Sequence, residues 1–144
     1  MKIENLIEKL QNFSDLSLQE SWDNSGIQIL LGNNDISNIV ISLDITEEVV
    51  DFAIEKNANL IISHHPLFFS GVKSINFKKP NERIIIKAIK HNISILSFHT
   101  NIDKSINGLA DFFCQKLKLT DTKPLSSINY EKVFSFYLSC FIDI

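Results

Sequence analysis

The apolar residues at the start of the chain are spaced as in an amphipathic helix. They recur at intervals of three and four residues, which places them on one stripe of that helix: Ile3, Leu6, Ile7 and Leu10. The polar residues that follow end the helix near Asn12. Two mostly apolar segments come next, at 27–31 and 39–43, and each predicts a strand. Because residues 32–35 (GNND) suit a tight turn, we expect these two strands to pair with each other.

From residue 39 onward, strands alternate with helices. The strand at 39–43 leads to a helix that either Asp44 or Thr46 can cap and that Asn57 closes. The remaining elements follow in the same rhythm: a strand at 60–63, a helix at about 81–90 entered from Pro80, a strand at 93–98, and a helix at about 107–117 with Leu109, Phe112 and Phe113 facing inward. This alternation is typical of an α/β fold in which crossover helices connect a mostly parallel sheet. The strands contain no charged residues, which indicates that both faces of the sheet are covered.

A strongly apolar run at 133–142 (VFSFYLSCFI) predicts a final strand. The sequence stops two residues later, without a helix that could cover this strand. We therefore expect residues 1–144 to form a single α/β domain that is the N-terminal part of a longer chain, or a domain that needs partner subunits to cover the strand.

Composition and motifs exclude several classes of protein. With 144 residues, 44% of them hydrophobic, 22% charged and a net charge of −3, the chain resembles an ordinary globular domain. Arg83 is its single arginine, and the pI is near 5.8, so we expect no nucleic-acid partner. The glycines form neither a dinucleotide-binding nor a P-loop motif, and no GxSxG elbow occurs. The chain opens without a signal peptide, and its longest uncharged stretch is ten residues where a membrane span needs about 20, so we expect a cytoplasmic protein without a membrane partner.

Histidines follow two of the predicted parallel strands at the point where each strand ends. His64 and His65 come directly after the strand at 60–63, and His99 follows the strand at 93–98. Ligands of open parallel sheets bind beyond the carboxyl ends of the strands, so we expect these three histidines on one edge of the sheet. Asp103, four residues after His99, can reach the same edge. Imidazole and carboxylate are ligands that Zn²⁺, Mn²⁺ or Fe²⁺ accept.

Some roles at this edge remain open on the sequence alone. Adjacent histidines cannot point the same way from an extended backbone, so His64 and His65 either divide their rings between sheet and cleft or serve two neighbouring metal ions. Hydrogen-bonded core histidines are the alternative to a metal site. Asp44 serves equally well as a helix cap or as a residue of the site. His91, at the end of a lysine-bearing helix, complements the helix dipole and is assigned a structural role.

Four segments occur in the order and spacing of the GTP cyclohydrolase I type 2 homologue family, which the sequence resembles over roughly residues 1–120. They are ESWDNSGI at 20–27, SLD at 42–44, IISHHPLF at 61–68 and HTNID at 99–103. The resemblance implies a three-layer α/β/α protein that assembles as a toroidal homohexamer. It also implies two divalent metal ions that face an internal cavity, and the imidazole and carboxylate ligands favour Zn, Mn or Fe for these ions.

The same resemblance implies roles for individual residues. His64 and His65 of the HHP motif divide between the two metals, and Asp103 binds one of them. His99 is expected near the site, where it orients a ligand or a metal-bound water. Three further residues line the approach to the cavity or form a structural turn: Trp22, Asp23 and Asn24.

The sequence departs from the family pattern after Asp103. Members of the family complete the metal site with a histidine and a bridging glutamate near their own C-terminus, whereas no histidine follows Asp103 here. We therefore expect either a chain that ends before those ligands or a degenerate member with weakened metal binding.

These observations predict a metal-dependent hydrolase that acts on a nucleotide-like small molecule. The family name suggests the imidazole ring of GTP as the reacting group. A non-catalytic metal-binding protein with an interaction or regulatory role is the alternative hypothesis, and an ordinary metallophosphoesterase is a weaker third.

Overall fold

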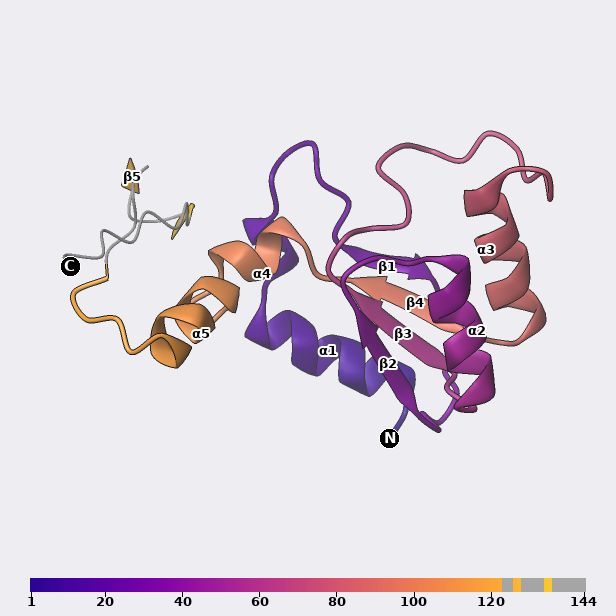
Figure 1. Cartoon of the computed structure of the whole chain (residues 1–144), viewed down its shortest axis with the longest axis horizontal. Helices are drawn as coiled ribbons and strands as arrows, with labels where there is room; N and C mark the ends of the chain where they lie inside the picture. The colour runs from indigo at the N-terminus through magenta and orange to yellow at the C-terminus, as the bar shows by residue number, and fades with distance from the viewer. Residues whose placement is uncertain (123–125, 128–133, 136–144) are drawn as a thin grey trace.

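The computed structural model describes residues 1–122, 126–127 and 134–135, and its centre is a four-stranded sheet (Figure 1). The strands lie in the order β1-β4-β3-β2, and their bounds are β1 Gly26–Ile29, β2 Ile39–Ser42, β3 Leu60–Ser63 and β4 Ser94–Ser97. The pairs β2–β3 and β3–β4 are parallel, whereas β1 is antiparallel to β4. Two short strands, β5 (Ser126–Ser127) and β6 (Phe134–Ser135), pair separately.

Helices cover both faces of the sheet (Figure 1). Their bounds are α1 Ile3–Phe13, α2 Glu47–Glu55, α3 Pro80–Lys90, α4 Thr100–Lys104 and α5 Leu109–Lys116, with a short 3₁₀ turn, η1, at Leu16–Leu18. Helix α1 packs on one face, and α2 and α3 pack on the other. The predicted α/β class, its three layers and its mostly parallel sheet are therefore confirmed.

Neighbouring residues of the central strands supply both halves of the core. On β3, Leu60 packs with α1 while Ile61 packs with α2 and α3. On β4, Leu96 packs with α1 and Ile95 packs with α2 and α3. Because successive side chains of a strand point to opposite faces, two buried faces require a strand that is apolar throughout. This explains the uncharged strands of the sequence.

The expected pairing of the first two strands is wrong. Strand β1 pairs with β4, with Gly26 opposite Ser97, and not with β2. This pairing gives β4, all four of whose residues are buried, a hydrogen-bonded neighbour on each side. The turn at 32–35 instead holds the start of α1, because the backbone N–H of Ile3 donates to the carbonyl of Asn34 at 3.0 Å.

The prediction that the helix at about 107–117 turns its apolar side chains inward is also wrong. Leu109, Phe112 and Phe113 of α5 are 37%, 50% and 47% exposed. Helix α5 packs beside α4 and lies away from the sheet in Figure 1, so the sheet does not cover its apolar side chains. The strand predicted at 133–142 lies almost entirely outside the described residues.

None of the helices in the described part of the chain is long and apolar enough to cross a membrane.

Candidate metal centre

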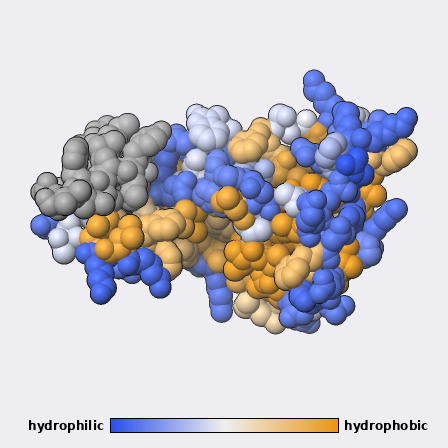
Figure 2. All heavy atoms as spheres, in the orientation of Figure 1, coloured by the Kyte–Doolittle hydropathy of each residue, from blue (hydrophilic) through white to orange (hydrophobic). Residues whose placement is uncertain are grey.

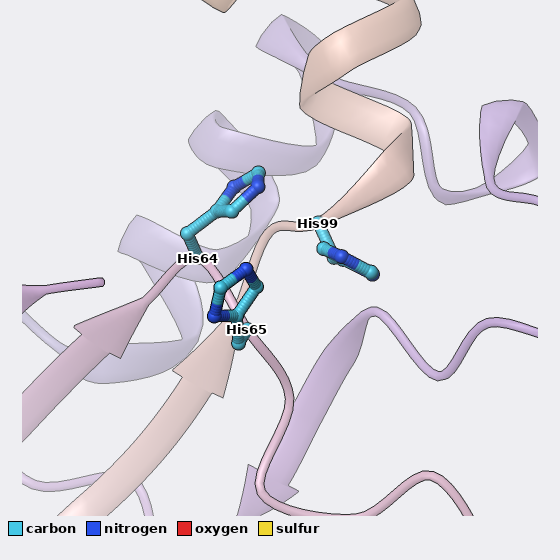
Figure 3. Close-up of side chains that lie close together, drawn as sticks. All are labelled: His64, His65 and His99. Carbon is cyan, nitrogen blue, oxygen red and sulfur yellow. The ribbon is translucent and has the colours of Figure 1, made fainter. Parts of the chain in front are cut away.

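Three histidines meet where β3 and β4 end (Figure 3). His64 and His65 follow β3 directly, and His99 lies two residues beyond β4. One potential ligand nitrogen from each ring lies within 4.8 Å of the other two. The ring centroids are 5.1 Å apart for His64–His65, 5.1 Å for His64–His99 and 5.4 Å for His65–His99. The parallel pairing of the two strands thus brings together side chains that are up to 35 positions apart in the sequence.

Each imidazole is anchored through its Nδ1 atom. His64 Nδ1 donates to the backbone carbonyl of Phe98 at 2.9 Å. His65 Nδ1 contacts Asp44 Oδ1 at 2.7 Å, and His99 Nδ1 contacts Asp23 Oδ1 at 2.9 Å. Carbonyl and carboxylate oxygens only accept hydrogen bonds, so in the neutral form of each ring Nδ1 carries the proton and Nε2 keeps a free lone pair. Metal-binding histidines in proteins are oriented in this way.

Asp23 holds the loop before β1 against the segment after β4. Its side chain is fully buried and accepts hydrogen bonds from the His99 ring, from the Thr100 backbone N–H and hydroxyl, and from the Ser25 hydroxyl. Burial alone would raise the pKa of Asp23, but the hydrogen bonds from Thr100, His99, Asn24 and Ser25 outweigh burial and lower the pKa to about 2. The group is therefore a carboxylate at neutral pH and fixes the direction of the His99 ring.

Asp103 faces the cluster from the first turn of α4. Its Oδ2 atom lies 3.9 Å from His64 Nε2. Burial raises the pKa of Asp103, which the nearby histidines partly oppose, and burial lowers the pKa of His64. Without a metal, both shifts favour the uncharged forms. A divalent ion would take the neutral imidazole as it is and would displace any proton from Asp103.

The donor set fits a divalent transition-metal ion. Imidazole nitrogens suit Zn²⁺ and Fe²⁺, and a neighbouring carboxylate supplies an oxygen ligand that Mn²⁺ also accepts.

The role of Asp44 is resolved by two contacts: Thr46 Oγ1 accepts from the Val49 N–H and caps α2, whereas Asp44 contacts His65. Asp44 therefore belongs to the surroundings of the histidines and is not the helix cap.

The structure brings the other predicted residues to the same end of the sheet. The Trp22 ring lies edge-on to His99 with a centroid separation of 5.9 Å, and the Asn24 side chain donates to the Phe68 carbonyl at 2.7 Å. Both residues line a cleft of about 460 Å³ beside the histidines. His91, which was assigned a structural role, caps the C-terminal end of α3 and lies outside the cluster.

Phe69 is a neighbour of the cluster that sequence reasoning missed. Its ring meets the His99 ring edge-on at a centroid separation of 5.9 Å. Trp22, which also contacts His99, lies nearly 50 positions before Phe69 in the sequence. Phe69 follows Leu67 and Phe68 in a loop, and a loop position gives no periodic signal of such a contact. The hydrogen bonds that Thr100 and Ser25 donate to Asp23 could not be predicted from the sequence either, because only the fold brings these side chains together.

Comparison with known proteins places these motifs in a described family. A family model described as Duf34/NIF3 (NGG1p interacting factor 3) matches residues 1–141. A Staphylococcus epidermidis protein named GTP cyclohydrolase 1 type 2 homolog is 40% identical over 144 residues, covering 99% of this chain and 38% of its own. A Bacillus subtilis protein of the same name is 37% identical over 121 residues, covering 84% of this chain and 32% of its own.

A solved structure agrees with the sequence comparisons. The crystal structure of a Bacillus cereus protein related to NIF3 superposes with a TM-score of 0.81 at 37% identity, covering 88% of this chain and 35% of the other. The chain thus spans about a third of the length of the curated relatives it matches.

Proposed function

Because the chain belongs to the Duf34/NIF3 family, we propose that it binds two divalent metal ions at the edge of the sheet where β3 and β4 end. In this proposal His64 and His65 divide between the two ions, and Asp103 binds one of them. The ions are Zn²⁺, Mn²⁺ or Fe²⁺. The observation that carries the proposal is the convergence of three imidazoles, each with Nδ1 anchored and Nε2 free.

We propose further that the metal centre belongs to a metal-dependent hydrolase that acts on a nucleotide-like small molecule. The names of the relatives support this proposal, since they include GTP cyclohydrolase 1 type 2 homolog. A divalent metal held by His64, His65 and Asp103 would lower the pKa of a water toward about 7 and would polarise a substrate oxygen. The chain's own residues prepare the site: Asp44 orients His65, and Asp23 orients His99.

A non-catalytic role is the second candidate, and the family description favours it. That description reads NGG1p interacting factor 3, which names an interaction and no reaction. In this reading, the metal stabilises a protein whose function is binding or regulation. The same histidines and aspartates would hold the metal, so metal content alone does not separate the two candidates.

For the whole protein we propose a homohexamer in the cytoplasm, with a small-molecule substrate and without nucleic-acid or membrane partners. The net charge of −3 and the single arginine, Arg83, support the absence of a nucleic-acid partner, because phosphate backbones are bound mainly by Lys and Arg. The exposed apolar residues of β2, described below, support self-association.

Metal content tests the ligand assignment. We expect His64→Ala and Asp103→Asn to hold less metal per chain than the unaltered protein after purification and exposure to Zn²⁺, Mn²⁺ or Fe²⁺. His91→Ala removes a histidine outside the cluster and should leave the metal content unchanged. Elemental analysis of the four proteins decides the matter, and equal metal in all of them would show that the assignment is wrong.

Product release separates the two candidate functions. The metal-loaded protein is incubated with a panel of nucleotides, and formate and phosphate are measured. Release that disappears in His64→Ala but persists in His91→Ala supports a hydrolase. Metal binding without any product across the panel, at stoichiometric amounts of protein, supports the interaction role.

A further inference from the structure

A cleft beside the histidine cluster has the size of a small-molecule site. Its volume is about 460 Å³, and it lies between the loop before β1 and the loop after β3. Pockets for small molecules commonly measure about 300–1,000 Å³. The residues that line it are Ser21, Trp22, Asp23, Asn24, Phe68, Phe69 and a short run at 70–72.

Two exposed aromatic side chains form walls of this cleft. Trp22 is 60% exposed and Phe69 is 57% exposed, although both rings contact His99. Each contact is edge-on, with interplanar angles of 73° for Trp22 and 77° for Phe69. More than half of each side chain therefore remains open to solvent beside the proposed metal centre. Exposed aromatic rings at the wall of a concave site are typical of ligand contact.

Hydrogen bonds hold the two walls in a fixed relation. The Asn24 side chain donates to the Phe68 carbonyl at 2.7 Å. Gln28, which is 9% exposed, joins the same two loops: its amide nitrogen donates to the Asn24 carbonyl at 2.7 Å, and its Oε1 accepts from the Phe68 N–H at 3.1 Å. The cleft is thus formed before any ligand binds, which reduces the entropy cost of binding.

The polar lining favours an uncharged ligand. No lysine or arginine lines the cleft within the described part of the chain. Its one carboxylate, Asp23, is buried and already accepts hydrogen bonds from His99, Thr100 and Ser25. Ser21, Asn24 and Ser70 line the cleft as neutral polar residues. The site thus offers aromatic contact and neutral hydrogen bonding, but no countercharge for an anion.

We propose that this cleft binds a planar, uncharged aromatic ring, which stacks on Trp22 and Phe69 next to the histidine cluster. As part of a substrate, such a ring would be held beside the metal centre, and in that respect the inference rests on the proposed function. Binding of the ring itself depends only on residues of the cleft. It is therefore tested on the metal-free chain as well as on the metal-loaded one.

Fluorescence of Trp22 reports on the cleft directly, because Trp22 is the only tryptophan of the chain. Caffeine serves as a planar uncharged bicyclic probe. Benzamide and cyclohexanecarboxamide form a matched pair that differs only in the aromaticity of the ring. We expect caffeine and benzamide to quench the emission saturably, with or without metal, and cyclohexanecarboxamide to have no saturable effect.

Variants connect the signal to the two walls. Phe69→Ala should weaken caffeine binding by about two- to tenfold, the effect of losing one aromatic pair. Phe77→Ala removes another exposed phenylalanine, 67% against 57% for Phe69, that lies outside the cleft, and it should leave binding unchanged. In calorimetry, Trp22→Phe should retain binding that Trp22→Ala loses. Circular dichroism checks that every variant is folded.

The outcomes separate this inference from the metal assignment. Equal binding of the two amides, equal affinity of Phe69→Ala and the unaltered chain, or no binding of either aromatic probe would overturn the aromatic cleft whether or not metal is bound. Aromatic binding by a chain that holds no metal would support the cleft while contradicting the proposed metal function.

Discussion

At the level of single residues, the Asp23 carboxylate connects parts of the chain that lie 76 and 77 positions apart. It accepts from the His99 ring at 2.9 Å and from the Thr100 backbone N–H at 3.0 Å. These contacts fix the direction of the His99 ring and hold the start of α4 in place. Asp44 makes the corresponding contact to His65, but its side chain is 58% exposed, so solvent competes with that contact.

We predict that Asp23→Asn weakens metal binding by about 10- to 100-fold, as changes to the hydrogen-bond partners of metal ligands commonly do. An amide has one acceptor oxygen where the carboxylate has two, so its NH₂ group would face the N–H donor of either His99 or Thr100. Titration calorimetry with Zn²⁺ measures the effect. Asp51→Asn changes an exposed aspartate paired with Lys87 and should bind Zn²⁺ normally. Equal affinities for both variants would contradict the orienting role.

The sequence indicated which residue types belong to the site, but not how they are held. His64 and His65 follow β3 at the edge where ligands of parallel sheets bind, and this position could be read from the strand pattern. The contacts of Asp23 with His99 and of Phe69 with His99 join segments that no periodicity connects. They depend on loop conformations that tertiary packing determines.

At the level of elements, the length of a segment decides how well the sequence predicts it. Helix α4 has five residues, too few to display an apolar stripe, and the sequence did not predict it. Strand β3 has the predicted bounds, because a continuous apolar run between polar residues defines it well. The partner of β1 was predicted wrongly because turn-forming residues show where a chain bends and not which strand it then joins.

The junction of α4 and α5 depends on Gly108, the residue before α5. A Cβ atom at this position would lie 2.1 Å from the Ile102 carbonyl oxygen and 2.7 Å from the Ser105 carbonyl oxygen. Both are backbone atoms that cannot turn aside. We therefore predict that Gly108→Ala lowers the free energy of unfolding by about 1–3 kcal/mol, the usual cost of overpacking.

Urea denaturation measures this change, and Gly71→Ala is the matched control. A Cβ at Gly71 meets nothing within 4 Å, so its effect should stay within about 0.5 kcal/mol. Similar stabilities of the two variants would show that α4 and α5 do not pack as closely as described.

For the molecule as a whole, the sheet leaves an apolar strip on its outer strand. Ile39, Ile41 and Leu43 are 40%, 80% and 61% exposed, and β2 is an edge strand. Figure 2 shows hydrophobic surface gathered over this part of the sheet. An exposed apolar edge strand favours association with another chain.

We predict that Ile41→Lys reduces self-association of the 144-residue chain. A charge at this position opposes edge-to-edge contact, and since the side chain is largely exposed, the fold should tolerate it. Sedimentation velocity over a range of concentrations measures the effect. Ile89→Lys alters a half-exposed isoleucine on α3 and should leave the association state unchanged. An identical concentration dependence for both variants would show that the strip takes no part in association.

The antiparallel pairing of β1 with β4 also has a consequence for the order of folding. Gly26 lies opposite Ser97, so β1 cannot find its partner until about 70 further residues have been synthesised and placed. The units from β2 to β3 and from β3 to β4 are more local and close shorter loops, which costs less entropy. We therefore expect β1 to join the sheet last. The loop that carries Asp23 arrives with it, so the third histidine gains its anchor only in the final step, and a metal ion that requires all three would bind only the chain that has completed folding.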